Sequence, residues 1–512
     1  MKRFSQLSST WKLSGILVIF SVIVLGNITR WSIWFDEAFT AYIVRFNFAE
    51  IYRYTSLDLH PPLYYWAAKL WTVAFGTTEL TFRSLSLVFA IVGLIGLYKL
   101  TKKLFNEKTG LIVTAAVSLS PMLIRFSEEA RMYTMVFAIV MWATYLLVLQ
   151  TRDKPKTWRW VAYGVLISAG MWVHYYAALA WLAHWVWRYV ELRIKSKKHA
   201  FKRLFTKDWV LTYSLAVGLY LPWLPYAVTQ FATLQGGFWI PRFGAYTPVD
   251  YVSNGWMYQE YGRLVDWQAV LFIATVIAIG VVAMKARKHI PRKDKQGIRL
   301  FVVMALAPPL ILMLLSLPPL KPSFIDRYVL TSLVFLIGFV VLLIGYLPRR
   351  KNRLPLMASS LVALTLVVGI FNVYYYGNYN KNSWTSIRVR EVTELVDKQG
   401  VFGQPIITDN WLIYYEASFY DSREHRVYFI DDKIDYGIGA TKMLEENNAG
   451  KIKNLTEFAT RNPRVWFLTS AGDEVDVEPP VQSWKKVRGV EAYDYIDEGA
   501  KYRAILYDTT DK

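Results

Sequence analysis

Long apolar runs, separated by shorter polar segments, occupy the sequence up to about residue 375. An α-helix needs about 20 mostly apolar residues to cross the hydrocarbon core of a bilayer. The pattern therefore predicts about eleven transmembrane helices. They are expected at residues 13–29, 82–100, 110–126, 132–149, 159–176, 177–190, 209–228, 268–284, 299–317, 327–346 and 354–375.

The polar segments between these runs alternate in charge, and every second one is rich in Lys and Arg. Cytoplasmic loops of membrane proteins carry an excess of these residues. We therefore expect the N-terminus in the cytoplasm and the C-terminal part of the chain outside. The basic segments lie at residues 99–108, 152–159, 188–207, 285–299 and 349–353.

Two apolar stretches need separate treatment. The basic N-terminus and the run at 13–29 resemble a signal peptide. However, the run has spanning length and is followed by Trp31 and Trp34, so we expect an uncleaved first span. Residues 61–75 are apolar but short and carry Lys69, which predicts a helix that lies in the outer interface.

Beyond about residue 377 the composition becomes that of a soluble domain. An amphipathic helix is expected at 384–398. Short strands are expected at 405–409, 426–430, 464–469 and 502–507. The predicted fold is therefore a polytopic α-helical membrane domain, residues 1–376 with an outer loop at 30–81, and a small extracytoplasmic α/β domain at 377–512. That domain has no glycine-rich nucleotide-binding pattern.

The composition agrees with a membrane protein, with 54% hydrophobic residues, 19% charged residues and a mean hydropathy of +0.23. A net charge of +20 would otherwise suggest a nucleic-acid partner. Because the cations lie between predicted spans, we expect membrane lipid as partner and no nucleic acid. The absence of cysteine excludes disulfides, thiolate metal ligands and thiol nucleophiles.

Many other ionisable residues lie at the predicted outer ends of the spans. A transporter or proton pump would be expected to carry such groups at mid-membrane depth. Here they would line a cavity at one surface. These groups are Asp36, Glu37, His60, Arg125, Glu128, Glu129, Arg131, His174, Asp326 and Arg327.

Each of these groups also has a structural explanation. Asp36 could cap the next helix, and His60 could pack where that outer loop turns. Arg131 could pair with a nearby carboxylate, and His174 could belong to an interfacial aromatic cluster. In the chemical interpretation, Asp36 is a general base for a hydroxyl, while Arg131 and Arg327 bind a lipid phosphate.

Five motifs follow one another along the chain. They are an acidic pair at 36–37, HisProProLeuTyrTyr at 60–65, PheGly-x-x-Glu-x-x-x-Arg at 75–83, GluAlaArgMetTyr at 129–133 and ArgTyr at 327–328. Their order resembles the GT-C membrane glycosyltransferases, especially the protein O-mannosyltransferase and aminoarabinose-transferase branch. The resemblance covers about residues 1–375.

The resemblance implies transfer of a sugar from a polyprenyl-phosphate-linked donor to a glycan, lipid or protein acceptor at the outer membrane face. It suggests Asp36 and Glu37 as the catalytic carboxylates. The residues expected to bind substrate are His60, Tyr64, Glu129, Arg131, Tyr133, His174, Arg327 and Tyr328.

The chemistry of such a transfer agrees with this set of residues. A lipid phosphate leaves as a stable anion, so the enzyme needs one base and nearby cations rather than the two carboxylates of a glycosidase. This predicts a single inverting displacement. A divalent cation could bind Asp36, Glu37 and His60, but the set is small and no metal site is assigned. The alternatives are a lipid-sugar flippase or transporter and a non-enzymatic membrane scaffold.

Overall fold

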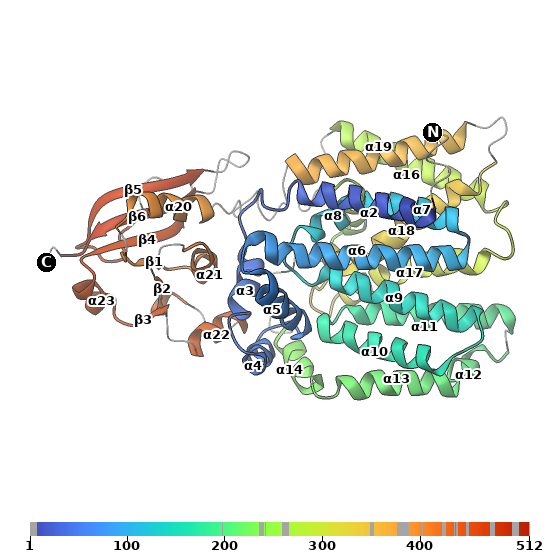
Figure 1. Ribbon diagram of the computed structural model, residues 1–512, viewed down its shortest axis with the longest axis horizontal. Helices are drawn as coiled ribbons and strands as arrows, with labels where there is room; N and C mark the ends of the chain where they lie inside the picture. The colour runs from blue at the N-terminus through green and yellow to red at the C-terminus, as the bar shows by residue number, and fades with distance from the viewer. Residues whose placement is uncertain are drawn as a thin grey trace. The chain divides into compact units, whose positions relative to one another are not determined.

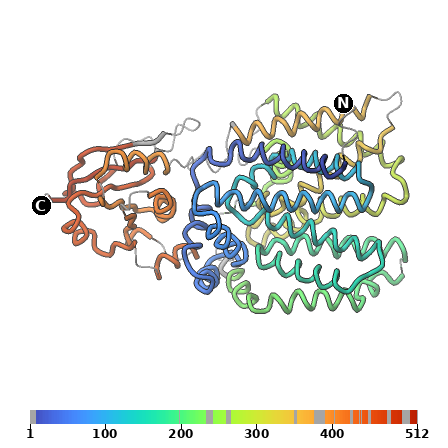
Figure 2. Tube along the Cα trace, in the orientation of Figure 1, coloured from blue at the N-terminus to red at the C-terminus, as the bar shows by residue number. Residues whose placement is uncertain are grey.

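The computed structural model is mostly helical, and the chain divides into two compact units. The first unit comprises Met1–Gly26 and Arg83–Tyr375, and the second comprises Asn27–Phe82 and Tyr376–Lys512. The second unit thus combines an early segment, blue in Figure 2, with the orange and red C-terminal residues. The structure describes residues 8–196, 198–234, 240, 242–258, 266–348, 353–375, 389–401, 403–421, 426–434, 436, 439–446, 450–471, 477–493 and 501–510.

Most long helices of the first unit run along a common direction (Figure 1). Each apolar run predicted from the sequence falls largely on one of these helices or on a consecutive pair. The helices are α2 (Ser9–Leu25), α6 (Glu79–Leu104), α7 (Glu107–Ser118), α8 (Pro121–Ser127), α9 (Tyr133–Arg152), α10 (Thr157–Val173), α11 (Ala177–Lys195), α12 (Ala200–Leu204), α13 (Lys207–Tyr220), α14 (Leu224–Leu234), α15 (Thr247–Met257), α16 (Asp266–Ala286), α17 (Lys295–Leu315), the 3-10 turn η1 (Asp326–Val329), α18 (Leu330–Gly345) and α19 (Leu354–Tyr375).

Several of these helices have the length and surface of membrane spans. Among the described residues, six helices are long and apolar enough to cross a bilayer, and the pair α7–α8, bent by 67°, would make a seventh. On α16, Val270, Ile273 and Ile277 lie about one turn apart and are 67%, 56% and 62% exposed, as expected for side chains that face lipid. The protein is a multi-pass membrane protein, and the total of eleven spans stays a prediction.

Buried polar side chains inside the helical unit form hydrogen bonds with one another. The ring of His184 on α11 lies between the hydroxyl oxygens of Thr144 on α9, 2.9 Å from Nε2, and Tyr163 on α10, 2.8 Å from Nδ1. The hydroxyl oxygens of Thr275 on α16 and Thr365 on α19 are 2.8 Å apart. Because lipid offers no hydrogen-bonding partners, these bonds favour one arrangement of the helices.

The second unit begins with three helices, α3 (Phe35–Ile43), α4 (Phe48–Leu57) and α5 (Leu63–Phe75). Pro61 and Pro62 immediately precede α5, where a fixed φ favours a helix start. On α5 the side chains of Leu70, Val73 and Phe75 are 61%, 77% and 61% exposed. The predicted helix at 61–75 is therefore confirmed as a helix with an apolar exposed face, and its place in the interface stays a prediction.

The C-terminal part of this unit is an α/β domain with one six-stranded sheet in the order β3-β2-β1-β4-β6-β5. β1 to β4 pair in parallel, whereas β6 runs antiparallel to both β4 and β5. The strands are β1 (Ile406–Thr408), β2 (Val427–Ile430), β3 (Lys451–Ile452), β4 (Arg464–Ala471), β5 (Lys485–Tyr493) and β6 (Lys501–Asp508). The helices are α20 (Val389–Gln399), α21 (Trp411–Tyr420), the 3-10 turn η3 (Asp431–Lys433), α22 (Gly439–Glu446) and α23 (Leu455–Arg461).

All four predicted strands are confirmed, and two further strands were not predicted. β3 has two residues, too few for a periodic pattern. β5 is an edge strand, and its cations Lys485, Lys486 and Arg488 interrupt the alternation of apolar and polar residues that predicts a strand. The predicted helix at 384–398 corresponds to α20 from Val389 onward, and residues 384–388 lie outside the described part.

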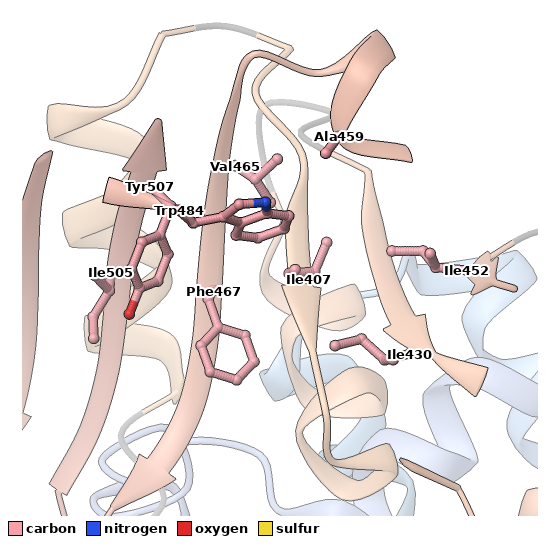
Figure 3. Close-up of a cluster of buried hydrophobic side chains, with 9 residues drawn as sticks. All are labelled: Ile407, Ile430, Ile452, Ala459, Val465, Phe467, Trp484, Ile505 and Tyr507. Carbon is pink, nitrogen blue, oxygen red and sulfur yellow. The ribbon is translucent and has the colours of Figure 1, made fainter. Parts of the chain in front are cut away.

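Alternate residues of the strands fill the two faces of the sheet. Figure 3 shows Ile407, Val465 and Phe467 from the central strands packed with Trp484 on one face, where Ala459 of α23 also lies. α20 and α21 pack on the sheet as well, α20 against β5 and β6 and α21 against β1 and β2. The sheet thereby forms the core of the domain, and α21 and α22 follow its strands β1 and β2 in the chain.

Candidate active site

The predicted site residues fall into two groups, one in each unit. Asp36, Glu37, His60 and Tyr64 belong to the second unit, and the remaining six belong to the first. That the two groups meet in one pocket stays a prediction.

The acidic pair lies in the first turn of α3. The side chain of Glu37 is buried, and its Oε2 accepts a hydrogen bond from the backbone N–H of Trp34 at 3.3 Å. This bond gives Glu37 a helix-capping contact across the first turn. Asp36 is partly exposed, and its carbonyl oxygen accepts from the Thr40 hydroxyl at 3.0 Å. Glu37 thus makes a capping contact of the kind that the sequence allowed for Asp36.

One face of α3 fixes the helix against the α/β domain. Phe35 packs edge-on against Trp411 of α21, with ring centroids 4.7 Å apart. Phe39 and Tyr42, further along the same face, lie 5.8 and 5.0 Å from Tyr415 of α21. Because residues four and three apart share one side of a helix, these contacts determine the direction in which α3 presents its carboxylates.

His60 lies between α4 and α5 and is held by a carboxylate that the sequence did not single out. Its Nδ1 is 3.4 Å from Oδ2 of Asp58, whose side chain is largely buried. An ionised carboxylate can only accept, so this contact favours the proton on Nδ1 of a neutral ring. Tyr64, in the first turn of α5, is fully buried against Tyr65.

In the first unit, Glu129 forms a buried ion pair with Arg125. Both side chains are at most 2% exposed, and Arg125 Nε also donates to the hydroxyl of Tyr258 at 3.1 Å. The sequence analysis placed Glu129 in the substrate site and did not predict this ion pair. Residues four apart contact each other directly only when the backbone between them forms a helical turn. Glu129 is therefore held in a fixed position by a cation.

The turn that carries Arg131 is tied to α6. The Ser86 hydroxyl lies 2.5 Å from the carbonyl oxygen of Glu129 and 3.2 Å from that of Arg131. Ser86 follows Arg83, the last residue of the PheGly-x-x-Glu-x-x-x-Arg motif, by about one helical turn. Arg83 and Arg131 are both almost fully buried.

Four of the predicted substrate-binding residues line one small cavity. Tyr133, His174, Arg327 and Tyr328 surround it together with Tyr176. The Arg327 guanidinium lies 5.8 Å from the Tyr133 ring centroid and 6.0 Å from that of Tyr328. The His174 ring lies 6.0 and 5.0 Å from the same two tyrosines. The structure thus brings together residues from α9, η1 and the α10–α11 connection.

This end of the helical unit concentrates buried positive charge. Among its described residues, the guanidinium groups of Arg83, Arg125, Arg131 and Arg327 are at most 5% exposed. The buried carboxylates beside them are Glu128 and Glu129. Burying cations is costly in a low-dielectric environment, and an anionic partner lowers that cost.

Metal binding has no support in the side chains that can be described. Within the described ranges, no three His, Asp or Glu residues lie close enough together to hold a metal ion. Asp36, Glu37 and His60 all lie within these described ranges.

The fold matches solved structures over nearly the whole chain. The crystal structure of ArnT from Cupriavidus metallidurans bound to undecaprenyl phosphate gives a TM-score of 0.63 at 10% sequence identity, covering 98% of this chain and 99% of ArnT. The chain has the GT-C glycosyltransferase fold. The same ArnT in its apo state gives a TM-score of 0.62 at 11% identity, covering 97% of this chain and 98% of ArnT.

A family model also matches part of the chain. Residues 59–226 match the family described as dolichyl-phosphate-mannose-protein mannosyltransferase. A weaker structural likeness is to the oligosaccharyltransferase AglB from Archaeoglobus fulgidus in complex with an inhibitory peptide and a dolichol-phosphate, with a TM-score of 0.47, 13% identity and coverage of 81% of this chain and 64% of AglB. A comparison with curated proteins finds no match. The GT-C resemblance expected from the motifs is confirmed.

Proposed function

We propose that this GT-C protein is a glycosyltransferase that moves a sugar from a polyprenyl-phosphate-linked donor to an acceptor hydroxyl at the outer face of the membrane. The observation that carries the proposal is the cavity of the first unit. There Arg327 lies against Tyr133, His174 and Tyr328, beside further buried arginines. Cations between aromatic rings at a lipid boundary suit the phosphate and the sugar of such a donor.

The comparisons support a lipid-phosphate substrate. ArnT was crystallised with undecaprenyl phosphate, and the matched family is described by a dolichyl-phosphate-linked mannose donor. Both ligands are polyprenyl phosphates, so we propose the same class for this chain. The sugar would be a hexose or a pentose, and the acceptor a glycan, a lipid or a protein.

The proposed reaction is one inverting displacement. The Asp36 carboxylate takes the proton of the acceptor hydroxyl while the hydroxyl oxygen attacks the anomeric carbon of the donor. The bond from that carbon to the phosphate oxygen breaks, and the polyprenyl phosphate leaves as an anion. Arg131 and Arg327 would stabilise the phosphate, and the Arg125–Glu129 pair would hold the neighbouring turn in place.

The remaining predicted residues have positioning tasks in this scheme. We assign His60, Tyr64 and Glu37 to the loop around the acceptor and the base, and Glu129, Tyr133, His174 and Tyr328 to the surroundings of the donor. The reaction is placed outside the cell, with a cytoplasmic N-terminus and an extracytoplasmic α/β domain. The exposed apolar face of α5 would then lie in the outer interface.

The proposal is tested by mass spectrometry of lipids and glycoconjugates from cells with and without the protein. We expect one glycoconjugate to disappear and its polyprenyl-phosphate-linked donor to accumulate. Purified protein added to a lipid extract of the deficient cells should release free polyprenyl phosphate together with the glycosylated acceptor. A flippase would release none, and a scaffold would leave the donor level unchanged.

A further inference from the structure

The outer loop at residues 30–81 carries Asp36 and His60, and we call it the catalytic loop. The α/β domain contacts this loop at the N-terminus of α3, the helix that carries Asp36. Glu416 on α21 is 2% exposed, and its carboxyl group accepts a hydrogen bond from the backbone N–H of Phe35. Phe35 is the first residue of α3 and directly precedes Asp36. One of the backbone donors that a helix start leaves unpaired is therefore satisfied by the C-terminal domain.

A second set of bonds holds the segment just before α3. The hydroxyl of Tyr420, one turn beyond Glu416, accepts from the backbone N–H of Ile33 at 2.5 Å and donates to Glu79. Arg390 on α20 donates to Glu79 Oε2 at 3.1 Å. The same guanidinium donates to the carbonyl oxygens of residues 29 and 30, each at 3.1 Å.

A third contact reaches the turn that carries His60. Gly439, the first residue of α22, lies directly on the backbone of Leu57 and Asp58. A Cβ atom added to Gly439 would come within 2.2 Å of the Asp58 Cα and 2.3 Å of the Leu57 carbonyl oxygen. Backbone atoms cannot rotate away as a side chain can, so only glycine permits this approach.

The topology of the sheet explains why the Glu416 and Gly439 contacts come from one side of the domain. α21 follows the carboxyl end of β1, and α22 follows that of β2, which is parallel to it. In open α/β sheets this edge commonly binds ligands. Here the helices that leave it pack on α3 and α4 of the loop. The helices at this edge of the sheet therefore bind a segment of the same protein, α3 and α4.

We propose that the α/β domain is the positioning element of the catalytic loop, with Glu416 fixing the helix of Asp36 and Gly439 fixing the turn of His60. This inference rests on the proposed function, because it assigns Asp36 and His60 to the reaction. Neither Glu416 nor Gly439 touches the substrate in this scheme. They act by holding the base and the imidazole in the geometry that transfer requires.

The charge state of Glu416 determines which substitution should preserve its role. Burial raises the pKa of Glu416 well above its ordinary value, and the nearby Glu37 raises it further. Burial therefore favours the neutral form of the Glu416 carboxyl group, whose carbonyl oxygen can accept from Phe35. Glutamine has the same shape and the same acceptor, whereas alanine has no acceptor.

The first experiment compares Glu416→Ala, Glu416→Gln and the control Glu394→Ala, a solvent-facing glutamate on α20. Full-length variants are returned to deficient cells, and glycoconjugate formation is measured by mass spectrometry at equal protein level. Because small displacements of reacting groups slow a reaction by about 100-fold, we expect Glu416→Ala to lose about 10- to 100-fold. Glu416→Gln should restore transfer to within about threefold of the wild type, a range well inside that loss.

Two further readouts separate positioning from general unfolding. Binding of undecaprenyl phosphate to the purified full-length protein, measured by the rise in melting temperature, should be the same in Glu416→Ala and wild type. Hydrogen exchange should increase in residues 33–40 and stay unchanged in β4 and β6. Equal transfer by Glu416→Ala and Glu394→Ala overturns the proposal, as does failure of Glu416→Gln to restore transfer.

The second experiment compares Gly439→Ala with Gly489→Ala, where an added Cβ meets no atom nearer than 3.7 Å. Gly439→Ala should reduce transfer while undecaprenyl phosphate binding persists, and Gly489→Ala should change neither. Equal transfer by the two variants removes Gly439 from the proposal. If the wild-type protein transfers no sugar and releases no polyprenyl phosphate, the proposed function fails instead, whatever the Glu416 and Gly439 variants do.

Discussion

Asp36 and Glu37 are adjacent in sequence, but their surroundings suit different tasks. Glu37 is buried and bonded to the backbone of its own helix start, whereas Asp36 is partly exposed. A general base must reach its substrate, so the more accessible carboxylate is the better candidate. On the phosphate side, the Arg327 guanidinium lies near the rings of Tyr133 and Tyr328.

The first prediction concerns the base. Asp36→Asn preserves the size of the side chain but removes its basicity, so we expect transfer to fall by about 100- to 10,000-fold. The amount of protein in the membrane and the binding of undecaprenyl phosphate should stay at wild-type levels. Asp432→Asn, an exposed carboxylate in η3, is the matched control and should transfer normally. Near-normal turnover by Asp36→Asn would remove this residue from the mechanism.

The second prediction concerns the phosphate. Arg327→Ala removes a buried guanidinium beside the cavity, so we expect binding of undecaprenyl phosphate to weaken by about 10- to 100-fold, the loss of one charge-assisted hydrogen bond. Lys321→Ala removes an exposed cation from the same connection and should bind normally. The measurement is a titration of purified protein with undecaprenyl phosphate. A larger effect on the acceptor than on this lipid would contradict the assignment.

At the scale of elements, α3 depends on α21 for its place in the structure. An isolated helix of nine residues is unstable in water, so tertiary packing has to stabilise α3. Its aromatic face supplies that packing through Phe35, Phe39 and Tyr42. In the helical unit, hydrogen bonds such as that between Thr144 and His184 have the corresponding role.

The third prediction tests this interface. Tyr415→Ala removes a buried ring that contacts Phe39 and Tyr42, and a hydroxyl that donates to the Ala440 carbonyl oxygen at 2.8 Å. We expect a loss of about 3 kcal/mol in the stability of the second unit, a value typical of buried aromatic residues. Tyr415→Phe keeps the ring and should lose only about 1 kcal/mol. Thermal unfolding and hydrogen exchange in α3 measure both variants, and equal losses would contradict ring packing as the cause.

At the scale of the whole molecule, the charge pattern predicts which parts lie on each side of the membrane. Basic loops alternate with segments that carry the candidate chemistry, so the base, the arginines and the α/β domain are all assigned to the outside. A sugar donor on a lipid would then be used at the outer face of the membrane.

The fourth prediction tests this orientation. The chain contains no cysteine, so a single introduced thiol can be labelled without background. Lys453→Cys in the α/β domain and Lys293→Cys in the 285–299 segment are both exposed positions. A membrane-impermeant maleimide added to intact cells should label the first and not the second, and permeabilised cells should show both labelled. The reverse pattern would overturn the assigned orientation.

The sequence by itself determined the fold class and suggested the candidate site residues. Apolar runs of spanning length predicted helices because lipid leaves the backbone few alternatives, and alternation predicted β1, β2, β4 and β6. The motif order led to Tyr133, Arg327 and Tyr328, and the pattern of ionisable groups at the predicted outer ends led to His174. The structure places all four around one cavity. Both kinds of prediction depend on local periodicity and on residue types, which can be recognised in a linear sequence.

Only the tertiary structure decided which distant segments act together. Residues 27–82 form one compact unit with the C-terminal domain, although about 300 residues separate the two, because sequence distance does not limit packing once the chain is compact. The same holds for Asp58 beside His60, Arg125 beside Glu129 and Glu416 beneath Phe35. Each of these contacts depends on side-chain directions that only the folded backbone sets.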